Sequence, residues 1–535
     1  MINQGKFIWW KHGVIYHIYP LSFYDSNGDG KGDIPGIIQK LDYIAELGVD
    51  AIWISPVYLS PMMDFGYDVS NYREIDPVFG TLEDFKNLLS AAHSKGIKVI
   101  MDMIMNHTSH LHPWFIESRS SKLNNPKRNW YIWENADKGL KPNNWKSALG
   151  GSAWEYDTLT RQYYLHTFLK EQPDLNWRNS HMRKAFFDDI EFWLKMGVDG
   201  FRFDAINMIV KDNHLRNNPP FFGFFHYKKT WATRNQPVSY AIVRMLRKLL
   251  NKYENIVSIG EIYTLPPGSP AISASYLGNG TDSLHLTFDF SLIFCWWNAQ
   301  RYYKCIRDWY KHIPVKGWPS IVMSNHDLSR SINRFGTGLH KKEKAKVAAA
   351  LMLTLKGTPF IYYGEEIGMF NLKIGKSQIK DPVGKKFWPF YRGRDKARTP
   401  MQWNTQKNAG FTEGSPWLPV HPDFIENNVE SQKENPGSIF NVYKTLIKLH
   451  KEHKPLHAGE WKPILRGKDG VLAYSRTWEH EKIIVILNFT SGNKNIKIKI
   501  STQWKVLFST HKPKGEPLNL RDFVLLPFEA ILLER

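Results

Sequence analysis

The sequence contains very little cysteine for its length. Only two cysteines, Cys295 and Cys305, occur among 535 residues, which excludes a scaffold built from disulfides. They lie ten positions apart in an aromatic stretch of helical character. A continuous helix would separate them by about 15 Å, too far for a disulfide. We therefore expect both thiols to stay reduced.

Long apolar runs and a secretion leader are also missing from the sequence. No stretch of about 20 apolar residues occurs, so no membrane span is predicted. The first residues contain neither an apolar core nor a cleavage site of small residues. The sequence therefore predicts a cytoplasmic protein without a membrane partner.

Acidic residues are outnumbered, but the basic residues are not clustered. Lys and Arg total 71 against 51 Asp and Glu, a formal net charge of +20. No run of five or more basic residues occurs, and zinc-finger, homeodomain and RNP patterns are missing. A solvated basic surface is favoured over a nucleic-acid partner.

The order of apolar segments predicts an α/β fold, a (β/α)₈ TIM barrel. Strand-like runs alternate with helix-like runs, and Thr81 and Ser180 are expected to cap two of the helices. In such a barrel the active site lies at the carboxyl ends of the strands. The eight expected strands are 14–19, 51–55, 97–101, 198–203, 256–260, 284–288, 321–323 and 360–363.

Two regions depart from this alternation and are expected to form separate domains. Residues 107–177 are rich in loops and follow the third strand, which predicts an inserted subdomain. Residues 459–535 contain short alternating strands, which predict a C-terminal antiparallel β-sandwich domain. Residues 1–106 and 178–458 would then form the catalytic barrel.

Acidic residues follow three of the expected strands. Asp204 ends the fourth strand, Glu261 the fifth and Asp327 the seventh. Arg202 lies two residues before Asp204, hence on the same face of its strand, where it would orient the carboxylate. Carboxylates that meet at one end of a barrel are typical of glycosidic-bond chemistry.

The motifs around these acids resemble those of glycoside hydrolase family 13, the α-amylase family, and within it the oligo-1,6-glucosidase/α-glucosidase branch. The resemblance extends over essentially the whole chain. It rests on segments 102–107, 200–207, 260–263, 324–327, 357–366 and 394–403, and on the branch marker Gln-Pro-Asp-Leu-Asn at 172–176.

The resemblance implies a retaining glycosidase that acts on small oligosaccharides as a monomer or homodimer. Asp204 would be the nucleophile, Glu261 the general acid and base, and Asp327 the partner of the sugar 2-OH and 3-OH. Asp68 and Arg398 would hold the 4-OH and close the pocket, which favours exo over endo cleavage. The remaining substrate-binding residues would be Tyr67, His107, Arg202, His326 and Arg330, the last at the pocket mouth.

The linkage preference is less well defined by the sequence. Ala205 follows the nucleophile, and in this branch a small residue there goes with α-1,4 substrates, whereas valine goes with α-1,6 substrates. We expect an α-1,4 preference. An α-1,6-preferring oligo-1,6-glucosidase and an α-glucosyltransferase or sucrose-acting relative stay open as alternatives. The aromatic stretch 217–225 either builds outer subsites or packs internally.

An acidic loop near the N-terminus is a candidate cation site. Side-chain oxygens of Asp25, Asn27, Asp29 and Asp33, with the carbonyl of Lys31, follow the spacing of a calcium-binding loop. Gly36 stands where an EF-hand has its bidentate glutamate, so the loop is not an EF-hand. The family branch implies structural Ca²⁺ here, with Mg²⁺ as the alternative ion.

Overall fold

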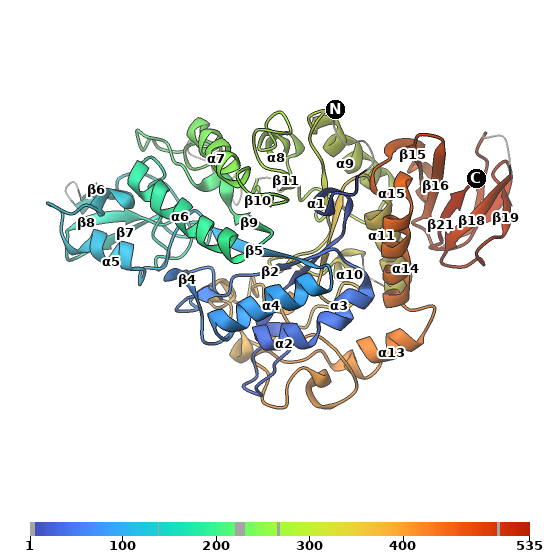
Figure 1. The fold of residues 1–535 in the computed structure, drawn as a ribbon, viewed down its shortest axis with the longest axis horizontal. Helices are drawn as coiled ribbons and strands as arrows, with labels where there is room; N and C mark the ends of the chain where they lie inside the picture. The colour runs from blue at the N-terminus through green and yellow to red at the C-terminus, as the bar shows by residue number, and fades with distance from the viewer. Residues whose placement is uncertain (1–5, 137–138, 220–229, 265–267, 337, 500–502) are drawn as a thin grey trace.

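The computed structural model describes residues 6–136, 139–219, 230–264, 268–336, 338–499 and 503–535. Its centre is a barrel of eight parallel strands (Figure 1). The strands are almost entirely buried, as parallel strands covered on both faces must be. They are β1 Ile15–Ile18, β2 Ala51–Ile54, β5 Lys98–Ile104, β9 Gly200–Asp204, β10 Val257–Glu261, β11 Leu286–Phe288, β12 Ser320–Val322 and β13 Thr358–Tyr362.

The strands pair in the order β11-β10-β9-β5-β2-β1-β13-β12. The two end strands meet to close the ring, and Ser320 Oγ donates a hydrogen bond of 2.7 Å to the Thr287 carbonyl across that seam. The predicted barrel is confirmed. Because all strands are parallel, β9, β10 and β12 place Asp204, Glu261 and Asp327 at one end of it.

Helices surround the barrel (Figure 1). The Thr81 cap is confirmed by a capping box with Asp84, but Asn179 rather than Ser180 caps its helix. Residues 34–47 form two helices that meet at Lys40 rather than a single one, and a helix of only six residues follows β10. The helices are α2 Ile34–Gln39, α3 Leu41–Leu47, α4 Leu82–Ser94, α6 Ser180–Met196, α7 Pro237–Leu250, α8 Pro270–Ser275, α9 Ala299–His312, α11 Lys341–Thr354 and α14 Ile439–Glu452.

Further elements lie at opposite ends of the molecule (Figure 1). Helix α5 Pro113–Ser120 and a sheet of β6 Trp133–Asn135, β8 Gln162–Leu165 and β7 Trp154–Asp157 fall within 107–177. The C-terminal segment forms an antiparallel sheet in the order β14 Glu460–Arg466, β15 Val471–Trp478, β16 Glu481–Asn488, β21 Ala530–Glu534, β18 Gln503–Ser509 and β19 Pro517–Asn519, beside the pair β17 Lys494–Ile496 and β20 Phe523–Leu525. The domain bounds themselves stay a prediction.

Shorter elements complete the chain and include the segments that approach the barrel mouth. They are α1 Trp9–His12, β3 Tyr58–Leu59, β4 Asn71–Ile75, α10 Ser331–Arg334, α12 Pro382–Phe387, α13 Val429–Glu434 and α15 Lys454–His457. Of these, α12 belongs to the long insertion after β13.

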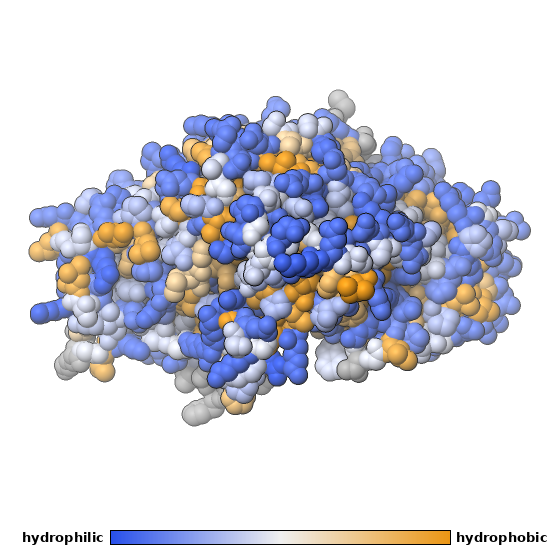
Figure 2. All heavy atoms as spheres, turned by 90° about the horizontal axis from the view of Figure 1, so that it is seen from below, coloured by the Kyte–Doolittle hydropathy of each residue, from blue (hydrophilic) through white to orange (hydrophobic). Residues whose placement is uncertain are grey.

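The face drawn in Figure 2 is mainly hydrophilic, and its apolar residues form small separate groups. Within the described ranges, no helix has the length and apolar character needed to cross a membrane. The expected cytoplasmic location stays a prediction.

The two cysteines are closer than the sequence suggested. Cys305 lies in α9, but Cys295 precedes that helix, and both thiols are free. A hydrogen bond between the two thiols raises the pKa of Cys295 and lowers that of Cys305. The expected separation was wrong because the chain turns between residues 291 and 298 instead of continuing as a helix.

Candidate active site

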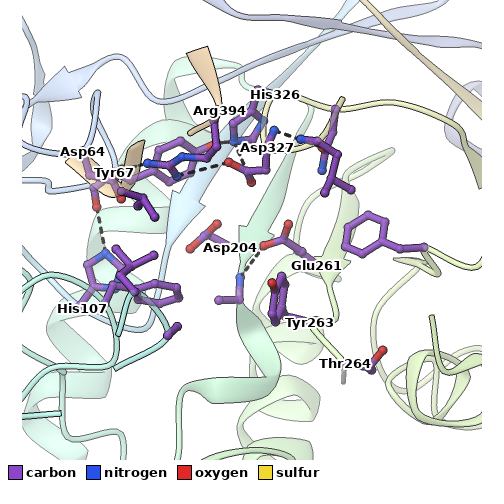
Figure 3. A pocket seen from close by; sticks show the side chains of 18 of the residues that line it. Asp64, Tyr67, His107, Asp204, Glu261, Tyr263, Thr264, His326, Asp327 and Arg394 are labelled. Atoms are coloured by element: carbon purple, nitrogen blue, oxygen red, sulfur yellow. Dashed lines mark hydrogen bonds and ion pairs between the residues drawn. The ribbon is translucent and has the colours of Figure 1, made fainter. Parts of the chain in front are cut away.

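A cavity of about 370 Å³ opens at the carboxyl end of the barrel strands. Its walls carry most of the residues that the sequence singled out, and Figure 3 shows Asp204 and Glu261 side by side in it. The predicted residues that line the cavity are Tyr67, His107, Asp204, Glu261, His326 and Asp327.

One buried arginine holds three carboxylates beneath the cavity. Arg202 Nη1 is 2.7 Å from Asp102 Oδ1 and 2.8 Å from Asp204 Oδ1. Its Nη2 is 2.9 Å from Glu261 Oε1. Arg202 itself has no exposed surface, so it fixes the two acids without reaching the cavity. A planar guanidinium presents its donors from two separate terminal nitrogens in a fixed plane, a geometry that the single ammonium group of a lysine lacks.

Burial changes the protonation of these acids. It raises the pKa of Asp204 to about 6 and that of Glu261 to about 8, although the charge of Arg202 acts in the opposite direction on both. At neutral pH this combination favours an ionised Asp204 beside a protonated Glu261. The two groups titrate as an interacting pair, so the order of their pKa values matters more than either number.

Asp327 is held in its charged form. Burial acts against that charge, but His326, Arg394 and Arg398 outweigh it, and the pKa of Asp327 falls below its usual range. Its Oδ1 is 2.9 Å from Arg398 Nη2 and 3.4 Å from Arg394 Nη1. Asp327 therefore offers carboxylate oxygens to a ligand at neutral pH.

Tyr67, His107 and His326 line the cavity beside the acids. The Tyr67 hydroxyl is 2.8 Å from His326 Nε2 and donates to Asp102 Oδ2 at 3.0 Å. The rings of Tyr67 and His326 stack with centroids 5.3 Å apart. His107 Nε2 lies 3.0 Å from the Tyr67 carbonyl and 3.1 Å from Gln172 Nε2. The branch marker at Gln172 thus fixes the position of His107.

Asp68 is not placed where the sequence analysis expected it. It has no exposed surface, and its oxygens accept from Ser60 Oγ and from the backbone amides of Met63 and Asp64. Burial raises the pKa of Asp68 to about 6. The carboxylate closes a turn behind the cavity, so the prediction that Asp68 binds substrate is wrong.

Asp64 and Arg394 occupy the cavity wall instead. Arg394 Nη2 is 2.6 Å from Asp64 Oδ1 and 2.9 Å from Asp381 Oδ1, and both Asp64 and Arg394 line the cavity (Figure 3). Sequence reasoning missed this pair. The available sequence signal was that Arg394 opens the motif segment 394–403, whereas the positive φ of Phe65 and of the glycine after it, which turns the chain beside Asp64, is seen only in the structure.

The two other predicted arginines lie behind the cavity. Arg398 is buried, donates from Nε to the His326 carbonyl at 2.8 Å and pairs with Asp327, so it reaches a ligand only through those residues. Arg330 is 2% exposed and donates from Nη1 to the Tyr363 carbonyl at 2.6 Å. The predicted place of Arg330 at the pocket mouth is wrong, because its guanidinium packs inward against the end of β13.

Ala205 lines the cavity directly after Asp204. Its backbone is left-handed, with φ 42° and ψ 35°, a conformation that a β-branched residue disfavours. Its amide donates to Glu261 Oε2 at 3.3 Å. Of the aromatic stretch 217–225, residues 220–225 lie outside the described residues.

The acidic loop near the N-terminus closes on its own backbone. Asp25 Oδ1 accepts from the amides of Asn27 and Gly28, and Oδ2 accepts from the amide of Gly30. Asp29 Oδ1 accepts from the Lys31 amide, and Asp33 caps α2. Among the residues that the structure describes, no group of three or more His, Cys, Asp or Glu is arranged to hold a metal ion.

Comparisons with known proteins agree with this geometry. The family model for the α-amylase catalytic domain matches residues 17–459. The chain is 42% identical to an oligo-1,6-glucosidase of Parageobacillus thermoglucosidasius, over 98% of each chain. It is 39% identical to a probable α-glucosidase of Rhizobium meliloti, over 92% of this chain and 91% of the relative. The crystal structure of the α-glucosyl transfer enzyme XgtA is similar with a TM-score of 0.93 and 37% identity, over 99% of this chain and 100% of that one.

Proposed function

This chain belongs to the α-amylase family of glycoside hydrolases, and from that premise we propose that it is a retaining exo-α-glucosidase. It releases α-glucose from the non-reducing end of short α-glucosides. The observation that carries this proposal is the shared guanidinium of Arg202. Because Asp204 and Glu261 both bind it within 3 Å, their carboxyl groups lie close together, and a retaining mechanism uses carboxyl groups only about 5 Å apart.

The two acids then have complementary tasks. In the first step Glu261 gives its proton to the glycosidic oxygen while an Asp204 oxygen attacks the anomeric carbon. The aglycone leaves as an alcohol, and a glucosyl ester remains on Asp204. In the second step the Glu261 carboxylate takes a proton from water, the water oxygen attacks the anomeric carbon, and the electron pair of the ester bond returns to Asp204.

The remaining cavity residues hold the terminal glucose. Asp327 accepts hydrogen bonds from the 2-OH and 3-OH, which strengthen as positive charge develops on the sugar ring. His107 and His326 bind the same ring. Asp64 and Arg394 bind the 4-OH and close the cavity beyond it, which restricts cleavage to chain ends.

For the linkage we propose an α-1,4 preference, supported by the small side chain of Ala205 and by its left-handed backbone. An α-1,6 preference is the second candidate, because similar proteins carry the name oligo-1,6-glucosidase. The test compares kcat/KM for maltose, isomaltose and sucrose, with the first-released anomer followed by NMR. A higher kcat/KM for maltose, with α-glucose released first, supports the proposal. Release of β-glucose would overturn the retaining mechanism. A strong preference for isomaltose would overturn the proposed linkage.

We also propose that the loop 25–33 binds Ca²⁺, with Mg²⁺ as the alternative ion. Its donor set fits a hard cation, since it consists of oxygens from Asp25, Asn27, Asp29 and Asp33 and the Lys31 carbonyl. The observed hydrogen bonds to backbone amides hold the same oxygens in a tight loop. The ion would stabilise the loop and take no part in the chemistry.

A further inference from the structure

The two cysteines lie against each other beside the cavity. Cys305 belongs to α9, and Cys295 belongs to the loop 289–298, which joins β11 to that helix. Both thiols are free, and a hydrogen bond joins them. Because the sequence contains no third cysteine, each thiol can pair within the chain only with the other.

The loop turns the side chain of Cys295 into the protein. Phe294 and Trp296, its two neighbours in the chain, are 44% and 73% exposed, whereas Cys295 is only 8% exposed. The Cys295 amide donates to the Leu292 carbonyl at 3.3 Å, which bends the chain at this point. The thiol therefore faces the core rather than the solvent.

Cys305 lies at the edge of the buried face of α9. The buried residues of this helix include Tyr302, Ile306 and Trp309, and Cys305 stands beside this stripe with its side chain partly exposed. It packs against the main hydrophobic core, to which Cys295 belongs. A reagent from the solvent therefore reaches Cys305 before it reaches Cys295.

The hydrogen bond between the thiols also makes their acidities different. It lowers the pKa of the Cys305 thiol, although burial and the charges of Asp289 and Asp308 act in the opposite direction. The same bond is the main reason why the pKa of Cys295 is raised. Since the thiolate is the reactive form of cysteine, the more accessible thiol is also the more nucleophilic one.

We propose that Cys305 and Cys295 form an oxidisable pair, in which a peroxide oxidises Cys305 and Cys295 then converts the product into a disulfide. An accessible thiol beside a second, resolving thiol is the arrangement that supports this chemistry. The expectation that both thiols stay reduced would then hold only while no peroxide is present.

The reaction has two steps that balance without a further reactant. The Cys305 thiolate attacks one oxygen of hydrogen peroxide, the bond between the two oxygens breaks, and the departing hydroxide takes up a proton to become water. Cys305 is then a sulfenic acid. The Cys295 sulfur attacks the Cys305 sulfur, the bond from that sulfur to oxygen breaks, and the oxygen leaves as a second water with the Cys295 proton.

The disulfide acts on the wall of the cavity. Phe290 and Phe294 line the cavity, and both belong to the loop that the disulfide ties to α9. A disulfide holds two sulfurs closer than a hydrogen bond does, so the loop must shift at Cys295, directly beside Phe294. Asp204 and Glu261 belong to β9 and β10, so we expect a several-fold higher KM for maltose and a kcat that changes little. This effect on KM rests on the proposed function, whereas the disulfide itself does not.

Mass spectrometry tests the disulfide without any activity measurement. The full-length protein is treated with hydrogen peroxide, the remaining thiols are blocked with N-ethylmaleimide, and the chain is digested with trypsin. Cleavage after Arg301 and after Lys304 leaves the two cysteines in separate peptides, 253–301 and 305–307. We expect these peptides to be joined, with the loss of two hydrogen atoms, and to separate again after treatment with dithiothreitol. Peptides that stay separate, or a link between two copies of the chain, would overturn the proposal.

Two single-cysteine variants test the order of the steps. In Cys295→Ser the sulfenic acid on Cys305 has no thiol to resolve it, so dimedone should trap it there. In Cys305→Ser the buried Cys295 should react with peroxide about tenfold more slowly or less. Equal rates in the two variants would overturn the role of Cys305 as the attacking thiol. Melting temperatures check that both variants fold, and alanine replaces serine where a buried hydroxyl prevents folding.

The effect on the cavity is tested by measuring KM and kcat for maltose before and after peroxide treatment. KM should rise in the wild-type protein, return after treatment with dithiothreitol and stay constant in Cys295→Ala, which also controls for oxidation elsewhere in the chain. An unchanged KM in a wild-type sample that contains the disulfide would overturn the effect on the cavity. A reduced protein that releases no glucose from maltose would instead overturn the proposed function and leave the peptide result unaffected.

Discussion

The barrel mouth and the loop 25–33 are both rich in carboxylates, yet they hold them in opposite ways. At the mouth, Asp204 and Glu261 come from different strands and bind one buried guanidinium, that of Arg202. In the loop, Asp25 turns its oxygens onto the backbone amides of its own turn. The acids of the mouth are brought together by the barrel, whereas the loop combines local hydrogen bonds with contacts to the segment 411–417, including the Asp25 amide to the Phe411 carbonyl.

This difference shows how the fold creates reactivity. Carboxylates that converge in a buried site lose water and repel one another, and burial above all raises the pKa of Glu261 to about 8. Carboxylates that accept from local amides stabilise the turn in which they lie. The sequence contains acidic residues in both segments, so the number of acidic residues does not show which segment is reactive.

The largest effect should come from removing the nucleophile. Asp204→Ala should lower kcat on maltose by about four orders of magnitude, because the glucosyl ester has no oxygen on which to form. The steady-state rate of glucose release measures kcat. Asp188→Ala, on the exposed side of α6, is the matched control and should keep wild-type activity. Asp29→Ala changes an acid of the loop 25–33. If this variant lost as much activity as Asp204→Ala, the contrast between the barrel mouth and the loop would disappear.

Replacing the general acid should have the next largest effect. Glu261→Gln should lower kcat/KM on maltose by about 10²–10⁴-fold, but much less on p-nitrophenyl α-glucoside, whose leaving group needs no proton. Equal losses on the two substrates would contradict the role of Glu261 as an acid.

The pH dependence of kcat/KM tests the same pair without changing the protein's folded structure. The pKa of Asp204 is raised to about 6 and that of Glu261 to about 8. Activity should therefore rise as Asp204 ionises and fall at higher pH as Glu261 loses its proton. In Glu261→Gln the alkaline fall should disappear. An alkaline limb that persists in this variant would assign it to another group.

Two aspartates four residues apart allow a finer comparison within the mouth. Asp64→Asn should lower kcat/KM on maltose by about 10–100-fold, since it weakens a charged hydrogen bond to the 4-OH. Asp68→Asn should change kcat/KM little and lower the melting temperature instead, because its carboxylate only closes a turn. The reverse result would restore Asp68 as the ligand of glucose.

These aspartates also show how far the sequence predicts the site. Arg202, Asp204 and Glu261 were placed correctly because strand alternation and the parallel barrel determine where strand ends point. Asp64 and Arg394 were missed because no periodicity constrains them. Their meeting depends on a left-handed turn after Asp64 and on the path of the insertion after β13.

The smallest effect is expected at the loop itself. If it binds Ca²⁺, chelation by EDTA should lower the melting temperature by a few degrees, since an ion that binds only the folded state stabilises it. Asp29→Asn removes one charge but keeps an oxygen to accept from the Lys31 amide, so the variant should lose the calcium response without losing the turn. Differential scanning fluorimetry with and without Ca²⁺ measures the melting temperatures of the wild-type protein and of Asp29→Asn. The kcat of both proteins should stay the same with and without Ca²⁺. A wild-type protein that does not respond to EDTA would mean that the backbone amides alone satisfy these carboxylates, and the contrast with the mouth would then be complete.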